Sequence, residues 1–292
     1  MAGGILAILD DVATLLDDAA AMSKVAAKKT AGLLGDDLAV NAEKATGFHA
    51  SRELPVIWAI TKGALVNKLI ILPIAFLLSA FMPWLIVPVL LLGGAYLSYE
   101  GAEKVYEWIT RPEVSQPAAR ESSDNKKILH SESAKIKSAI RTDFILSIEI
   151  IVISLETVIQ QTLGIQIMVV SVIALLATAG VYGVVALIVR MDDSGLYLIE
   201  RANHMQGRFT SITRTTGVLL INSLPKVIHV LGIVGTIAML LVGGGMYVHN
   251  IDALHHFMSI LPALVADLIT GLIIGLILLL LMKLVKVVKT QG

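Results

Sequence analysis

The sequence predicts an all-α membrane protein, a polytopic helical bundle with about six transmembrane helices. Of its 292 residues, 56% are hydrophobic and only 16% are charged, whereas soluble domains carry about 25% charged residues. The mean hydropathy is +0.80. Several apolar stretches reach the roughly 20 residues that a helix needs to cross a bilayer. Composition and segment length therefore both indicate that most of the chain lies in lipid.

The apolar stretches divide into six predicted spans. The stretch 67–99 is too long for one span, and Pro83 near its middle suits the first turn of a new helix. We therefore predict a tight turn at Met82 between two spans. The third span is the most polar, because it contains Glu149 and Glu156. The six predicted spans are 67–81, 83–99, 144–164, 165–189, 227–248 and 262–282.

Basic residues predict the orientation of these spans. With both termini on the cytoplasmic side, all 23 Lys and Arg residues fall on that side, in 1–68, 100–141, 190–226 and 283–292, with Lys68 at the cytoplasmic end of the first span. The opposite connections hold none. This distribution follows the positive-inside rule. Treating 67–99 as a single span would place basic residues outside, so the rule also favours the turn at Met82.

The chain is predicted to divide into a cytoplasmic helical region, 1–66, and a transmembrane bundle, 67–292. The first region begins with an amphipathic helix. Within the bundle, 100–141 is predicted to be a polar cytoplasmic loop. Residues 208–226 are predicted to be interfacial or re-entrant, because the apolar run before Pro225 is too short to cross a membrane.

Paired aspartates recur outside the spans and allow two interpretations. They are suited to solvated helix faces and helix N-termini, and this is the interpretation that we favour. Clustered carboxylates also bind divalent cations, but no loop with EF-hand spacing contains them. The pairs are Asp10-Asp11, Asp17-Asp18, Asp36-Asp37 and Asp192-Asp193.

Ionisable side chains inside spans are the first candidates for a functional site, because each costs about 2.5–3.5 kcal/mol on insertion. Their functional interpretation is a polar path or proton relay through the bundle. The structural alternative is hydrogen bonding or ion pairing that fixes the helix register. Spacing places the first three candidates on one face of the third span. The candidates are Glu149, Glu156, Gln160, Lys226, His229 and Asp267.

A short connection between the last two spans contains a second candidate site. Imidazole and carboxylate groups three or four residues apart can bind zinc from one helical face. Such residues also commonly cap helices at a membrane interface, and this alternative stays open. The candidate metal ligands are His249, Asp252, His255 and His256.

Other features of the sequence limit the classes of function. Cysteine is absent, which excludes disulfides, thiolate metal sites and cysteine nucleophiles. No catalytic or nucleotide-binding motif occurs, so we expect no enzymatic activity and no cofactor. The zero net charge gives no indication of a nucleic-acid partner. The expected partners are the lipid bilayer, a small ion or solute, and further copies of the chain packed through glycine-rich helix faces.

Several stretches resemble the YedI-like family of bacterial inner-membrane proteins. They include LLDDVATLLDDAAAMSKVAAKKTAGLLGDDLAVNAEKATG, RELPVIWAITKGALVNKLI, KIKSAIRTDFILSIEI, VYGVVALIVRMDDSGLYL and GTIAMLLVGGGMYVHNI. The resemblance covers nearly the whole chain and implies a multi-pass protein of the bacterial cytoplasmic membrane. The function of that family is unknown, so the resemblance supplies no site residues.

The leading functional hypothesis is an inner-membrane transporter or channel for a small solute or ion, with proton coupling through intramembrane carboxylates such as Glu149. The acidic residues of the third span and the predicted break at Pro225 motivate it. The alternative is a membrane scaffold or regulatory protein that does not transport and binds a partner through its cytoplasmic helices.

Overall fold

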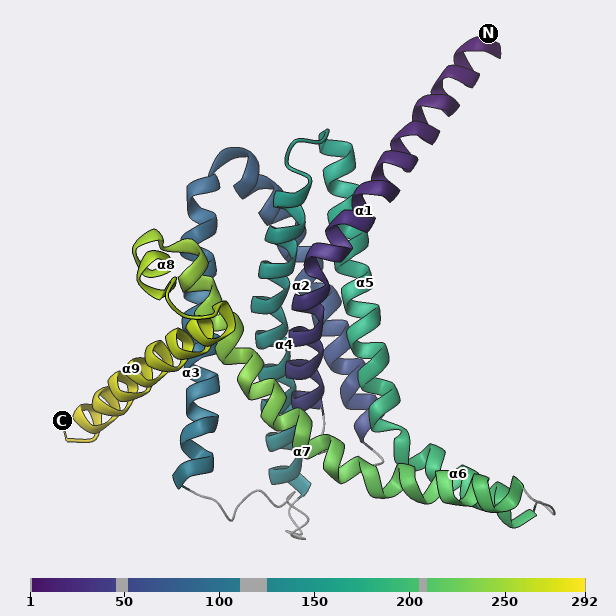
Figure 1. Cartoon of the computed structure of the whole chain (residues 1–292), viewed down its shortest axis with the longest axis vertical. Coiled ribbons are helices and arrows are strands. Elements are labelled where there is room, and N and C mark those ends of the chain that lie inside the picture. Colours follow the sequence, from purple (N-terminus) through teal and green to yellow (C-terminus); the bar gives the residue numbers. More distant parts are fainter. Residues whose placement is uncertain (1, 46–51, 111–124, 205–208, 292) are drawn as a thin grey trace.

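The structure, a computed structural model, describes residues 2–45, 52–110, 125–204 and 209–291. These residues form α-helices and one short 3₁₀-helix, which confirms the all-α prediction (Figure 1). The elements are α1 (Ala2–Ala45), α2 (Glu53–Phe81), η1 (Pro83–Leu85), α3 (Ile86–Thr110), α4 (Asn125–Thr157), α5 (Leu163–Val189), α6 (Met191–His204), α7 (Phe209–Asn250), α8 (Asp252–Met258) and α9 (Ala263–Gln291).

Within the described ranges, five helical segments are long and apolar enough to cross a membrane. The chain is therefore a membrane protein. Helix α4, which contains the predicted third span, is not among the five, because its first half is charged and its apolar part contains Glu149. Six spans and their orientation remain predictions. The five segments are Glu53–Phe81, Pro83–Thr110, Leu163–Val189, Phe209–Asn250 and Ala263–Val285.

The predicted turn at Met82 is confirmed. Helix α2 ends at Phe81, η1 forms the turn, and α3 begins at Ile86. The backbone N–H of Met82 donates to the carbonyl of Leu78 at 2.8 Å and closes the end of α2. Pro83 has no backbone N–H, which is tolerated at the start of η1 because the N–H of the first helical residue has no partner within the helix.

The turn between α4 and α5 differs from the prediction. The predicted boundary between spans lies at 164/165, but α4 ends at Thr157 and α5 begins at Leu163. The amide of Gln166 donates to the carbonyls of Ile159 and Gln161 at 3.1 and 2.9 Å. These bonds satisfy two carbonyls of the turn that joins α4 to α5.

Other helices extend beyond the predicted span ends. Helix α2 starts at Glu53 instead of residue 67, α3 continues to Thr110, and α4 starts at Asn125. Most of the predicted loop 100–141 is therefore helical, and its residues 111–124 lie outside the described residues. The two turns described above lie at one end of the bundle, which we call the turn end (Figure 1).

Helix α1 lies inside the bundle, although 1–66 was expected to form a separate region. Near the turn end, a Cβ on Gly164 of α5 would lie 3.8 Å from Leu15 Cδ1. Near the other end, Ala42 and Ala45 pack with residues of α2, α4 and α5 in one buried cluster. Small side chains allow this close packing. The charged side chains of α1 at Asp17, Asp18, Lys24, Lys28 and Lys29 are exposed, and those of Asp10 and Asp11 lie outside the described side chains.

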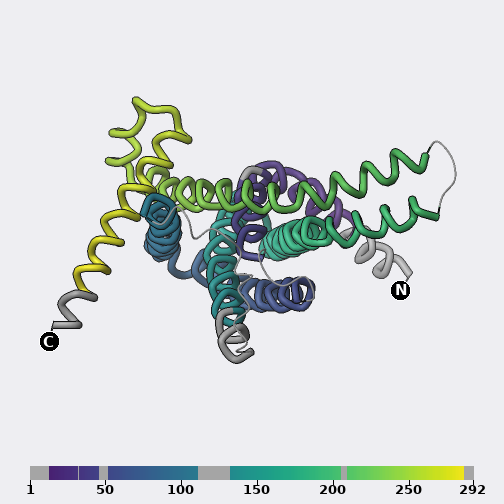
Figure 2. The backbone as a smooth tube through the Cα atoms, turned by 90° about the horizontal axis from the view of Figure 1, so that it is seen from below, coloured from purple at the N-terminus to yellow at the C-terminus, as the bar shows by residue number. Residues whose placement is uncertain are grey.

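Helix α7 is continuous through Pro225, so the predicted break there is wrong. Its first part pairs with α6 and projects sideways from the bundle (Figures 1 and 2). Gly195 and Gly217 allow this pairing, because a Cβ on either one would lie 2.6–2.7 Å from the backbone oxygen of the other. A helix tolerates an interior proline when its other contacts outweigh the loss of one hydrogen bond, about 3 kcal/mol.

Helices α3, α7 and α9 cross at glycines on the other side of the bundle. A Cβ on Gly244 of α7 would collide with the backbone of α9 at Asp267, and one on Gly271 of α9 would collide with the backbone of α7. Gly275 approaches α3 equally closely at Ser98. The GxxxG spacing of Gly271 and Gly275 in the sequence predicts a packing edge, and their close approach to α7 and α3 confirms it. By contrast, Gly180, Gly183 and Gly232 face open space.

Candidate functional site

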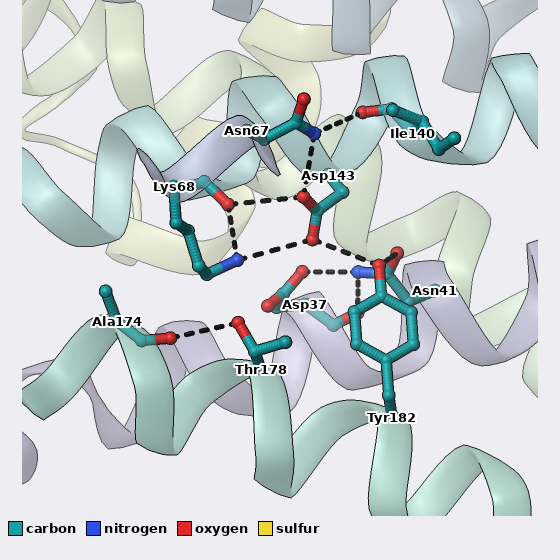
Figure 3. A network of polar contacts seen from close by, with 10 residues as sticks. Asp37, Asn41, Asn67, Lys68, Ile140, Asp143, Ala174, Thr178 and Tyr182 are labelled. Carbon is teal, nitrogen blue, oxygen red and sulfur yellow. Dashed lines mark hydrogen bonds and ion pairs between the residues drawn. The ribbon is translucent and has the colours of Figure 1, made fainter. Parts of the chain in front are cut away.

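The most deeply buried charges of the described residues form one network where α1, α2, α4 and α5 meet (Figure 3). At its centre the Lys68 ammonium of α2 lies 3.5 Å from the Asp143 carboxylate of α4. Their side chains are only 5% and 1% exposed. Lys68 also donates to Ser147 Oγ at 2.8 Å. The charged pair therefore has hydrogen bonds of its own, as a buried pair requires.

Neighbouring helices hold the Asp143 carboxylate in place. Asn67, directly before Lys68, donates its amide to Asp143 Oδ2 at 3.0 Å and to the carbonyl of Ile140 at 2.8 Å. From α5, Tyr182 contacts Asp143 Oδ1 at 3.0 Å. Three helices thus converge on one carboxylate.

Tyr182 connects this carboxylate to α1. Its hydroxyl also lies 3.0 Å from Asn41 Oδ1, and the Asn41 amide donates to the Asp37 carboxylate. Asp37 is 3% exposed. The charges of Lys68 and Asp143 both act on Asp37, so a single lysine lies among two buried carboxylates. The network is therefore one positive charge short.

Two further ion pairs hold α1 against α3 nearer the end of α1. Lys44 binds Glu100, which also accepts hydrogen bonds from Ser138 and Thr142 of α4. Its neighbour on α1, Glu43, binds Lys104 one turn further along α3. The charges alternate on both helices, so only one register satisfies both pairs.

We expect Lys44→Glu to destabilise the fold by about 3 kcal/mol, because it places two carboxylates together in a mostly buried position. Adding Glu100→Lys should restore much of this loss. Thermal unfolding in detergent measures both effects. Arg190→Ala is the control, since the Arg190–Asp193 pair is about half exposed and should contribute less than about 1 kcal/mol. Equal effects of Lys44→Glu and Arg190→Ala would contradict the assignment.

Glu149 lies on α4 beyond Asp143, toward the turn end, and is partly buried. The carboxylates of Asp36 and Asp37 lie close enough to act on it electrostatically. Among the described residues it has no hydrogen bond or ion pair. Of the predicted acidic stripe, only Glu149 faces the interior: Glu156 is exposed, and Gln160 is exposed in the α4–α5 turn.

The other predicted residues lie apart from this network. Lys226 and His229 are exposed on α7, so they do not pair with Glu149. Asp267 is buried at the α7–α9 crossing. A groove of about 440 Å³ at the corner of α5 and α6 also lies away from the network.

The predicted histidine cluster is spread over two helices and does not converge. His249 lies in the last turn of α7, and its ring Nδ1 lies 2.8 Å from the Gly245 carbonyl oxygen, to which only a protonated Nδ1 can donate. Its ring centroid lies 6.4 Å from that of His255 on α8. Asp252 and His256 are exposed. Within the described ranges, no group of three or more His, Cys, Asp or Glu side chains could hold a metal ion.

Sequence reasoning missed the centre of the network. Lys68 and Asp143 each lie at the edge of an apolar stretch, where charged residues usually mark the membrane surface. Asp37 was recognised only as one of the aspartate pairs. The one available signal was that Asn67-Lys68 stands between apolar residues on both sides.

Comparison with known families gives one match. A family model described as a protein of unknown function (DUF808) matches residues 3–285. No curated protein and no solved structure matches the chain.

Proposed function

The chain belongs to the family of proteins of unknown function DUF808, and we propose that it is an inner-membrane transporter or channel for a small cation, coupled to protons. The observation that carries the proposal is the buried network of Lys68, Asp143 and Asp37. The finer YedI-like resemblance remains a prediction, as do the cytoplasmic membrane location and assembly into homo-oligomers.

The charge balance of the network favours a cation as cargo. Lys68 can neutralise one of the carboxylates of Asp37 and Asp143, and Glu149 adds a third acidic group nearby. Unpaired ionised groups in a membrane bundle are costly and characteristically mark ion pathways or proton relays. The remaining negative charge is best compensated by a proton or a bound cation.

Tyr182 supports proton loading at Asp143. Its hydroxyl has one proton, yet it lies 3.0 Å from two acceptor oxygens, Asn41 Oδ1 and Asp143 Oδ1. If Asp143 carries a proton, it can donate to Tyr182, which then donates to Asn41. Both contacts become hydrogen bonds only in this state. Without this proton, the Asp143 carboxylate is available to Lys68, which lies 3.5 Å away, or to a transported cation.

Helix α1 favours transport over the scaffold alternative. Its buried face contributes Asp37 and Asn41 to the network and packs among α4, α5 and α7. That face is therefore not available to a cytoplasmic partner. A helix with polar residues inside a bundle of apolar helices is typical of a pathway that must bind ions.

We expect Glu149→Gln to abolish cation-driven proton movement in reconstituted vesicles, because the amide cannot accept or release a proton. Glu156→Gln is the matched control: the same helix and the same change, but an exposed side chain that should leave the flux unchanged. A pH-sensitive dye trapped in the vesicles measures the flux. Equal flux in Glu149→Gln and wild type would exclude a role for Glu149.

A further inference from the structure

Asp267 and Thr270 of α9 have buried oxygens without partners. Asp267 is 9% exposed and Thr270 is 3% exposed. Within the part of the chain that the structure describes, neither Asp267 Oδ1 nor Thr270 Oγ1 has a hydrogen-bond partner. Buried polar atoms nearly always have a partner, and an orphan suggests a missing ion or water. The two residues lie three apart, so their side chains share one side of the helix.

Thr270 differs from the other helical threonines with described hydroxyl bonds. Thr30, Thr178 and Thr236 each donate to the carbonyl four residues earlier, at 2.8–3.0 Å. This bond is the usual solution for a buried threonine in a helix. Thr270 does not make it, which leaves both lone pairs of its oxygen available to a ligand.

The environment of Asp267 provides no fixed cation. Among the described residues Asp267 forms no ion pair with Lys or Arg, and the titratable side chain that acts on it is that of His249. Gly245 of α7 leaves space at the carboxylate, since a Cβ there would lie 3.6 Å from both Asp267 Oδ2 and His249 Nδ1. An isolated buried carboxylate is costly unless it is neutralised.

We propose that Asp267 and Thr270 bind a small monovalent cation, such as Na⁺, at the α7–α9 crossing. No hydrogen bond joins the two oxygens within the described residues, so an ion that contacts both would give each of them a partner. Hard cations prefer oxygen ligands such as carboxylates and hydroxyls. A single carboxylate balances a single positive charge. A proton on Asp267 would leave Thr270 without a partner, whereas a cation serves both.

Ser98 of α3 also has an unpartnered buried hydroxyl, but it is not part of this site. Its oxygen faces Gly243, and its backbone packs on Gly275, two turns along α9 from Asp267. Cation binding by the Asp267–Thr270 pair does not depend on the proposed transport function. Only the idea that the bound ion is transported, or coupled to transport, rests on that proposed function.

Cation-dependent thermal stability of the purified full-length protein tests the proposal without any flux measurement. A ligand that binds only the folded state raises the melting temperature. Na⁺, Li⁺, K⁺, Mg²⁺ and Ca²⁺ chlorides are compared with N-methylglucamine chloride at equal ionic strength. We expect Na⁺ or Li⁺ to stabilise the wild type. Thr270→Val should raise the concentration for half-maximal stabilisation about tenfold, equivalent to about 1.4 kcal/mol, and Asp267→Asn should abolish it.

Thr236→Val is the matched control, because Thr236 is fully buried on α7 but its hydroxyl is bonded to Gly232. It should keep the full cation response whatever its effect on stability. Should Asp267→Asn fail to fold, Thr270→Val alone decides between the outcomes. No stabilisation by any cation, preference for a divalent ion, or an unchanged Na⁺ response in Thr270→Val would each overturn the proposal. A protein without flux that shows the expected responses would overturn only the transport function.

Discussion

Replacing Lys68 with methionine is expected to destabilise the protein by about 3–5 kcal/mol and to abolish transport. The change leaves Asp143, 1% exposed, without its cationic partner, and an unpaired buried charge is far more costly than a missing pair. Asp143→Asn should be milder for folding, because the Asp37 carboxylate still acts on Lys68 and Asn67 and Tyr182 can still bond to an amide. Unfolding in detergent gives the stabilities, and dye-loaded vesicles give the flux.

The double variant Lys68→Met with Asp143→Asn separates the two roles of the pair. Removing both charges together should recover most of the stability lost in Lys68→Met, since no unpaired charge remains. Transport should stay absent, because the titratable carboxylate is gone. A Lys68→Met protein as stable as wild type would show that the pair is not buried as described.

The second large effect is expected at the glycine crossing. Gly244→Ala should destabilise the protein by about 1–3 kcal/mol or more, because its Cβ would collide with the backbone of α9 and force the helices apart. The same change at Gly232, which faces open space on α7, should be neutral or stabilise by about 0.5–1 kcal/mol, because alanine favours a helix over glycine.

Thermal unfolding of the two alanine variants under one condition compares them directly. We expect the melting temperature to fall in Gly244→Ala and to stay the same or rise in Gly232→Ala, although both variants carry the same chemical change on the same helix. Equal melting temperatures would mean that α7 and α9 do not approach each other at Gly244. Loss of the crossing should also weaken the cation response at Asp267, which lies at the same contact.

The apolar helices and the turn at Met82 between α2 and α3 could be predicted from the sequence, because both depend on local properties. A run of apolar residues is visible in composition, and Pro83 marks the start of a helix. The glycine edge at Gly271 and Gly275 was visible for the same reason, since the spacing of small residues predicts close packing.

Helix α1 shows why the rest could not be predicted. Its charged residues indicate a solvent-exposed helix, and the charged side chains from Asp17 to Lys29 are indeed exposed, whereas Asp37 and Lys44 are buried. Its opposite face is mostly alanine, which has little hydrophobicity but permits close packing, so hydropathy does not identify it as part of the bundle. The position of Asp37 beside Lys68 follows from that packing and from no local signal.

The candidate residues illustrate the same limit. Glu149 could be selected because it interrupts an apolar stretch, and it lies near the network. Gln160 lies beyond the end of α4 at Thr157, so its spacing no longer implies a shared face. Glu156 is still in the last turn of α4, but its side chain is exposed. Lys226 seemed to begin a span only because Pro225 was expected to break α7, which is instead continuous.

The most direct test of the central claim is proton movement in vesicles containing wild-type protein or Asp143→Asn, after a cation gradient is imposed. We expect an outward cation gradient to change the internal pH of wild-type vesicles. Vesicles with Asp143→Asn should behave like empty ones, although the variant protein remains folded. Undiminished proton movement in Asp143→Asn, or none in wild type with any alkali cation, would contradict the claim that the buried network conducts ions.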